Sequence, residues 1–378
     1  MKRLLFSSFL LSASSRKALR LVCLSLLVLF GLLCETSSNR LPRTSNPYKT
    51  CYQYRNYRPT SYQLRYCTND HALFENVASV GVKLKPSSPT PLFEEECQYW
   101  MAVERWNCSG IKAPLFLGQM QPFVHHLTKE TAFTQALLSA LSFIKVARGC
   151  TSETFTSCKC MAGSSLGHLN RNEKWDLCMD NTVAANQATQ RFLDEMWQDT
   201  RFPDEERLVQ IHNLEAGRRA VMAPENYRKE CKCHGMTGDC ISKTCFKKVK
   251  SPRVIAEFIK RDLYHKAEKV ALLDKLHGAE LFTVKPIPTK PSHTSLVFTE
   301  DSPNYCVSNS IEYGALNVSG RECVESQQLY HHHRKGICDE ICCNGHRVVV
   351  TEEEYICRCV MNDCQTTCTR KVVRNFCQ

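Results

Sequence analysis

The residues of this sequence that are best suited to chemistry are its cysteines. Four of them, Cys231, Cys233, Cys240 and Cys245, fall within fifteen residues. Clustered thiols either oxidise to disulfides in an oxidising compartment or bind metal in the cytosol. Zinc knuckles ordinarily use Cys-x-x-Cys pairs, and this spacing is absent from the sequence. The 24 cysteines among 378 residues therefore predict a disulfide framework, with no metal site and no cofactor.

The spacing of these four cysteines predicts a stapled hairpin. Residues two apart in a strand share a face, and close neighbours rarely meet the geometry of a disulfide. We therefore expect nested bonds across the hairpin, Cys233 to Cys240 and Cys231 to Cys245. The tip between them is His234-Gly235-Met236-Thr237-Gly238-Asp239, in which the two glycines would supply the positive-φ positions of a tight reversal.

Two other patterns suggest chemistry and are rejected. Gly163-Ser164-Ser165-Leu166-Gly167 has the order of a hydrolase nucleophile elbow, but an elbow needs a buried strand before it and a helix after it, and both flanks are polar. The triplet His331-His332-His333 offers metal ligands, but three consecutive residues of a regular element cannot all face one ion. We expect no catalytic residue, and the protein is predicted not to be an enzyme.

The N-terminal sequence indicates the compartment. Basic residues up to Arg20 precede an apolar run from Leu21 to Cys34, which predicts a signal peptide over residues 1–34. Its removal leaves 22 cysteines, an even number that permits full pairing. We expect a secreted protein of the extracellular space or matrix, with N-glycosylation sequons at Asn107 and Asn317.

The net charge of +11 is concentrated between Arg218 and Lys269, where 14 basic and 6 acidic residues give an excess of +8. In a secreted protein such a surface favours sulfated glycosaminoglycans over nucleic acid. A solvated helix face that only keeps the protein soluble is the alternative, and the sequence leaves both open.

Hydrophobic periodicity predicts a helical first domain over residues 35–283. A strong helix is expected from Thr128 to about Ala147, where apolar residues recur at helical spacing. Further helices are expected over residues 180–199, between Pro203 and Pro224, and from Pro252 onward.

The rest of the chain changes in composition. Residues 284–303 are rich in Pro, Thr and Ser, which predicts an interdomain linker. Residues 304–378 hold ten cysteines, which predicts a small β-rich module stabilised by bridges.

Four segments, in order, together resemble signatures of the Wnt family. They are Arg105-Trp106-Asn107-Cys108-Ser109, Glu130-Thr131-Ala132-Phe133, Asn213 to Val221, and the cysteine hairpin that starts at Cys231. The resemblance spans roughly Cys67 to Cys377. It implies an α+β, disulfide-rich fold in which a helical domain carries the stapled hairpin as a thumb and a cysteine-rich β domain carries a second hairpin as a finger.

The resemblance also implies the partners and the bridges. The two digits of a Wnt grip the cysteine-rich domain of a Frizzled-type receptor, and an LRP-type co-receptor and heparan sulfate proteoglycans are further expected partners. Besides the two thumb bridges, the implied pairs are Cys51–Cys67, Cys97–Cys108, Cys150–Cys158, Cys160–Cys178, Cys306–Cys343, Cys323–Cys338, Cys342–Cys377, Cys357–Cys368 and Cys359–Cys364.

Two departures from the family pattern fall on the two digits. Asp239 stands where family members carry the serine that accepts a monounsaturated acyl chain. At the finger tip, Val360-Met361-Asn362-Asp363 replaces an aromatic tip and its adjacent cysteine pair. We therefore predict a divergent Wnt ligand that lacks the serine-linked acyl chain. The alternative is a glycosaminoglycan-binding matrix protein or decoy that does not activate a receptor.

Overall fold

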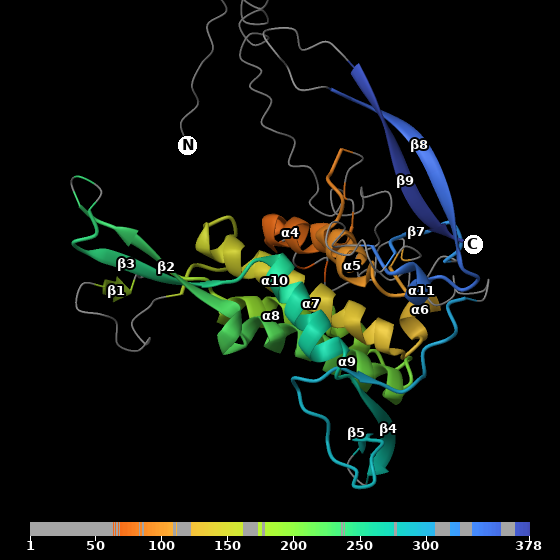
Figure 1. Ribbon diagram of the computed structural model, residues 1–378. Helices are drawn as coiled ribbons and strands as arrows, with labels where there is room; N and C mark the ends of the chain where they lie inside the picture. Colours follow the sequence, from red (N-terminus) through yellow and green to blue (C-terminus); the bar gives the residue numbers. More distant parts are fainter. Residues whose placement is uncertain are drawn as a thin grey trace, which may run out of the picture. The chain divides into compact units, whose positions relative to one another are not determined.

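The computed structural model describes residues 63, 65, 67, 69–82, 84, 87–108, 111, 122–161, 173–175, 178–235, 237, 239–275, 278–306, 318–325, 335–356 and 367–378 (Figure 1). The expected signal peptide, the Gly163 to Gly167 pattern and the histidine triplet lie outside these residues. Within the described part, no helix has the length and apolar character needed to cross a membrane.

The first domain is built around one central helix, α7 (Lys129–Thr151). Its start is fixed by Thr128, whose hydroxyl accepts a hydrogen bond from the Thr131 N–H at 3.4 Å. Nineteen of its 23 residues are buried, so the helix is covered on every side. The helices that pack around it are α4 (His71–Gly81), α5 (Leu92–Met101), α8 (Thr182–Leu193), α9 (Asp204–Met222) and α10 (Pro252–Phe258).

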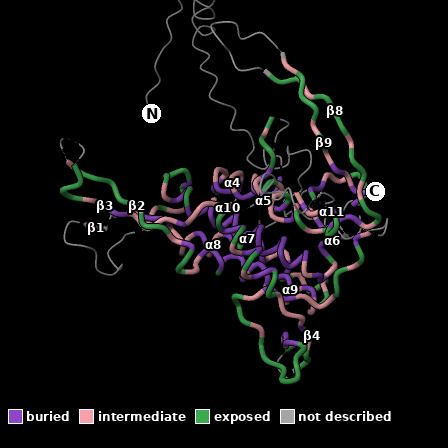
Figure 2. Tube along the Cα trace, in the orientation of Figure 1, coloured by how far each residue is buried: buried purple, intermediate pink, exposed green. Residues whose placement is uncertain are grey.

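Helices α7 and α9 approach each other closely at Gly217. A Cβ atom at this position would lie 2.1 Å from the carbonyl oxygen of Ala136, so only glycine permits the contact. The Asn213 to Val221 segment is therefore a packing surface, as Figure 2 shows by its burial.

The remaining helical segments are short. α6 (Pro122–His125) precedes α7, and η2 (Glu195–Gln198) and η3 (Pro224–Asn226) are 3-10 turns that follow α8 and α9. The prediction of a single helix over residues 180–199 is wrong, because α8 ends at Leu193 and a separate 3-10 turn, η2, begins after Asp194. After α10 the chain continues as a π-helical segment, η4 (Ile259–Tyr264).

Three small sheets complete the described fold. The first has the order β1-β3-β2 and consists of β1 (Glu173–Trp175), β2 (Tyr227–Cys233) and β3 (Lys243–Val249). The second, β5-β4-β6, consists of β4 (Glu268–Lys275), β5 (Gly278–Thr283) and β6 (Val297–Phe298). The third, β7-β9-β8, consists of β7 (Glu322–Cys323), β8 (His346–Ile356) and β9 (Thr367–Cys377), and the short helix α11 (Cys338–Ile341) precedes β8.

The expected linker, residues 284–303, is partly ordered against the helical domain. Its strand β6 pairs in parallel with β4, and Leu296 and Val297 are fully buried. The side-chain amide of Asn213 donates to the Val297 carbonyl and accepts from its N–H, both at 2.9 Å. The amide thus acts as a neighbouring strand would, which satisfies both buried backbone groups.

The cysteine-rich domain has little apolar core. Its buried cluster consists of Val318, Ile341 and four half-cystines, and bridges hold the chain where a larger core would otherwise be needed. The expected α+β fold is confirmed, with a helical domain, a stapled hairpin and a cysteine-rich β domain.

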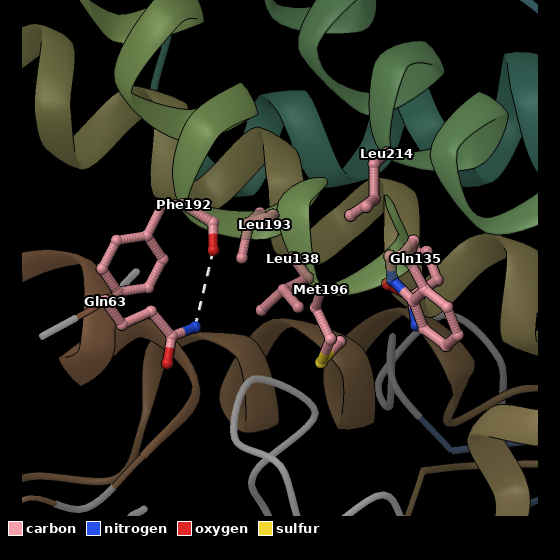
Figure 3. A pocket seen from close by; sticks show the side chains of 8 residues that line it. Gln63, Gln135, Leu138, Phe192, Leu193, Met196 and Leu214 are labelled. Carbon is pink, nitrogen blue, oxygen red and sulfur yellow. Dashed lines mark hydrogen bonds between the residues drawn. The ribbon is translucent and has the colours of Figure 1, made fainter. Parts of the chain in front are cut away.

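A cavity inside the helical core is a packing gap. Figure 3 shows Gln63 donating to the Phe192 carbonyl at 3.5 Å beside it, with Leu138 and Leu214 among its lining residues. Its volume is about 10 Å³, which leaves no room for a ligand larger than one water molecule.

Candidate functional site: the stapled hairpin

The thumb is the antiparallel hairpin of β2 and β3, labelled in Figure 1, with the tip between them. Its register places Cys231 directly opposite Cys245, and these two residues are bonded. A second bridge, Cys233–Cys240, closes the tip. Most of β2 and the tip is exposed, so bridges and ladder hydrogen bonds hold the shape of the hairpin.

The described residues of the tip are held by polar contacts. The His234 N–H donates to the Ser242 carbonyl at 2.8 Å, and its Nε2 lies 2.6 Å from the Thr244 hydroxyl. The Thr237 hydroxyl donates to the Asp239 carboxylate at 2.5 Å. Thr237 and Asp239 are exposed, while Met236 and Gly238 lie outside the described residues.

Gly235 is required for a reason other than the expected one. Its φ is not positive, so the expectation of a left-handed turn residue is wrong at this position. A Cβ atom here would lie 2.3 Å from the Asp239 carbonyl oxygen and 2.9 Å from its nitrogen. The glycine is therefore needed because the two sides of the tip touch backbone to backbone.

Cations lie on both faces of the thumb, and one of these faces also carries an aromatic ring. The strand alternation places Arg228, Lys232 and Lys248 on the same face as Phe246. The Lys232 and Lys248 ammonium groups lie 5.4 and 5.6 Å from the Phe246 ring centroid. A hydrogen bond from Lys248 lowers the pKa of Glu230, which lies among these cations. We call Arg228, Lys232, Phe246 and Lys248 the basic thumb face.

Sequence reasoning did not single out Thr244, whose hydroxyl lies against the His234 ring. The signal for it is the Lys-Thr-Cys run at the end of the thumb motif, which places Thr244 on β3 opposite Lys232 of β2.

Eight of the expected disulfides are formed in the structure. Besides the two thumb bridges they are Cys97–Cys108, Cys150–Cys158, Cys160–Cys178, Cys306–Cys343, Cys323–Cys338 and Cys342–Cys377. Cys67 and Cys368 are also disulfide-bonded. Cys51, Cys357, Cys359 and Cys364 lie outside the described residues, so their expected pairs stay predictions.

No set of free thiols that could bind a metal appears in the described part of the chain. Sulfur and carboxylate atoms cluster at Cys323, Cys342 and Cys377, and at Glu173, Cys231 and Cys245. Every cysteine of both clusters is disulfide-bonded and therefore cannot act as a thiolate ligand.

The other expected sites are only partly described. Asn107 is half-buried between Trp106 and Cys108, and its glycosylation stays a prediction. Asn317 and the finger tip, Val360 to Asp363, lie outside the described residues.

Comparison with known proteins decides the family. The model of the Wnt family matches residues 59–378. The chain belongs to the Wnt family. This Wnt protein is 30% identical over 303 residues to Protein Wnt-8a of Danio rerio, a match that covers 75% of this chain and 79% of that protein. It is also 30% identical over 306 residues to human Protein Wnt-3a, with 80% of each chain covered.

A solved structure agrees with the sequence comparisons. The structure of human WLS in complex with WNT8A matches this Wnt chain with a TM-score of 0.53 and 26% identity, over 85% of this chain and 96% of that one. Members of the Wnt family are disulfide-rich glycoprotein ligands of a developmental signalling pathway, and the predicted resemblance is confirmed.

Proposed function

We propose that this Wnt protein is secreted to the extracellular space and binds a Frizzled-type receptor through a thumb that carries no serine-linked acyl chain. The observation behind this proposal is the tip itself. Asp239 stands at the position of the family's acceptor serine, and its exposed carboxylate accepts a hydrogen bond from Thr237. A carboxylate cannot form the serine ester.

Loss of the acyl chain changes how binding energy can arise. Each buried CH₂ of a lipid contributes about 0.8 kcal/mol, so an unacylated thumb loses a large apolar contact. A carboxylate pressed into an apolar groove also carries a desolvation cost. We therefore expect the receptor to be contacted through the polar tip, His234 to Asp239, and through the finger tip, Val360 to Asp363, with an LRP-type co-receptor as a further partner.

A consequence concerns export. A related solved structure is a complex of WLS with WNT8A. If the thumb is unacylated, secretion of this chain should depend less on carriers that recognise the lipid than secretion of acylated relatives does.

The mass of the secreted protein tests the proposal. After deglycosylation, the intact mass and the fragmented thumb peptide should show no fatty-acyl group, and the bare protein should bind a receptor cysteine-rich domain. The variant Asp239→Ser, expressed with the acyltransferase, should gain an acyl mass, whereas Asp239→Asn should not. An acyl mass on Thr237 or Ser242 of the unaltered protein would overturn the unacylated thumb.

A second function is supported by the basic thumb face. Arg228, Lys232 and Lys248 share one side of the hairpin, where Glu230 forms ion pairs with Arg228 and Lys248 and leaves a net positive charge that suits the sulfates of heparan sulfate proteoglycans. A matrix protein or decoy would be retained on heparin and would bind cells without activating the pathway. Receptor-dependent activation by the purified protein would exclude the decoy.

A further inference from the structure

Tyr355 is the one tyrosine that the described part of the chain leaves exposed. It lies in β8 directly after Glu352, Glu353 and Glu354, and it is 45% exposed. Its hydroxyl forms no hydrogen bond with the described residues, and the guanidinium carbon of Arg370 lies 5.7 Å from its ring centroid. The phenol oxygen is therefore open to an enzyme.

The strand that carries Tyr355 lies at the edge of its sheet. The order β7-β9-β8 leaves one side of β8 without a neighbouring strand among the described residues (Figure 1). Figure 2 shows most of this strand as exposed. Proteins that recognise extended segments often add a strand to such an edge and read the side chains from there. The segment around Tyr355 is thus already extended and accessible.

The three glutamates give this segment a negative charge. Glu352 and Glu354 are exposed and form no ion pair with the described residues. Glu353, on the same face as Tyr355, pairs with Arg370 and Arg374, so its charge is compensated. Two uncompensated carboxylates therefore lie within three residues of the phenol, and they attract a basic enzyme site.

Tyr99 shows why the setting matters as well as the sequence. It also follows three glutamates, Glu94 to Glu96, but it lies in α5, whose backbone groups are bonded within the helix. The guanidinium carbon of Arg253 lies 3.3 Å from its ring centroid, and Arg253 pairs with Glu95 and Glu96. Tyr99 is therefore covered and its acidic neighbours are compensated, so it is a natural comparison for Tyr355.

The compartment limits which group can be transferred to the phenol. The domain that carries β8 is held by disulfides such as Cys342–Cys377, which form in the oxidising secretory route, away from cytosolic kinases. An adenylyl sulfate donor is polyanionic, so an enzyme that binds it needs a basic site, and such a site also attracts an acidic acceptor segment.

We propose that Tyr355 is a site of tyrosine O-sulfation. The phenol oxygen attacks the sulfur of an adenylyl sulfate donor, and the new O–S bond forms as the bond from sulfur to the phosphate oxygen breaks. A base of the transferase takes the phenol proton, the nucleotide phosphate leaves, and nothing is oxidised or reduced. This inference rests on the proposed secretion of the chain and not on the absence of an acyl group from the thumb.

Arg370 offers the product a counter-charge. A sulfate ester adds a negative charge next to the ring that Arg370 already contacts. The bond from Arg370 to Glu353 is long, at 3.3 Å, and Glu353 keeps Arg374 as a partner. The guanidinium can therefore turn to the sulfate without leaving the Glu353 carboxylate unpaired.

Mass spectrometry of the protein secreted by cultured cells tests the proposal. After deglycosylation, the peptide that contains Tyr355 should carry a sulfate mass that arylsulfatase removes and phosphatase does not, and the peptide that contains Tyr99 should carry none. An unmodified Tyr355, or a mass that phosphatase removes, overturns the proposal. Retention of the chain inside the cell would contradict the proposed secretion instead, and sulfation would then be decided by transfer to the purified protein.

That second assay uses protein from cells in which chlorate has blocked synthesis of the donor, mixed with a tyrosyl sulfotransferase and adenylyl sulfate. Tyr355→Phe should abolish transfer to this peptide. Glu352→Gln combined with Glu354→Gln should slow transfer about fivefold and leave the Tm unchanged, because both side chains are exposed. Glu257→Gln, at an exposed position of α10, is the matched control and should change nothing. Failure of the unaltered protein to accept sulfate at Tyr355 overturns the proposal.

Discussion

The guanidinium of Arg218 and the carboxylate of Asp194 form a bidentate ion pair inside the helical domain, with N–O distances of 2.8 and 2.7 Å. The two side chains are 3% and 4% exposed. Burial raises the pKa of Asp194, although Arg218 opposes this shift. Asp194 is the residue between α8 and η2, so the pair joins α9 to the point where the expected long helix breaks.

Loss of one partner of this pair should destabilise the protein strongly. Arg218→Met leaves the Asp194 carboxylate buried without its partner, and we expect the free energy of unfolding to fall by about 3–5 kcal/mol. Arg219→Met is the matched control, because Arg219 pairs with Glu215 at the surface and should cost less than about 1 kcal/mol. Denaturant unfolding measures both. Equal losses in the two variants would contradict the structural role of the buried pair.

Asn213 should control the attachment of the 284–303 segment to the helical domain. Asn213→Ala removes both hydrogen bonds to Val297 and leaves buried backbone groups unpaired, which should cost about 2–3 kcal/mol. The exchange of the Val297 amide hydrogen should accelerate accordingly. Asn76→Ala, which loses one half-buried hydrogen bond within α4, should leave that exchange rate unchanged. An unaltered exchange rate of the Val297 amide hydrogen in Asn213→Ala would show that Asn213 does not hold this segment in place.

His212 should make the same attachment sensitive to pH. Its Nε2 lies 3.0 Å from the Ser295 carbonyl and its ring stacks on His293, which pairs with Glu215. Burial, and then the nearby His293, lower the pKa of His212. The folded state therefore binds fewer protons, so this stability is present above the unfolded pKa of about 6.5 and is lost as the pH falls through the folded value.

The free energy of unfolding should be measured from about pH 7.5 to about pH 5, a window that brackets the pKa of roughly 6.5 of an unperturbed histidine. The unaltered protein should lose stability across this window more steeply than His212→Gln. His234→Gln, in the exposed thumb, should keep the steep dependence. Identical slopes for the unaltered protein and His212→Gln would rule out this contribution.

Gly235 should control the shape of the thumb tip without affecting global stability. In Gly235→Ala the new Cβ would meet the Asp239 carbonyl oxygen, so we expect the exposed tip to change conformation and relieve the clash instead of storing it as strain. We expect the Tm to stay the same, because the tip lies outside the hydrophobic core, while binding to a receptor cysteine-rich domain weakens. Val284→Ala, at an exposed position outside the thumb, is the control. Undiminished receptor binding would show that the tip conformation does not matter.

Local sequence patterns predicted the elements that depend on local physics. The start of α7 at Thr128 follows from its capping hydroxyl, and the thumb follows from the spacing of Cys231, Cys233, Cys240 and Cys245. Ile255, Ile259 and Leu263 recur at helical spacing and are all buried, as that spacing requires.

The sequence by itself determined the family, the disulfide-rich α+β fold and the replacement of the acceptor serine by Asp239, because motifs and cysteine spacing are local properties of the chain. Only the tertiary structure decided contacts between distant residues. The break at Asp194, the hydrogen bonds between Asn213 and Val297 and the backbone contact at Gly235 all depend on packing. No local pattern encodes such contacts, since burial and hydrogen bonding there are set by segments far apart in the chain.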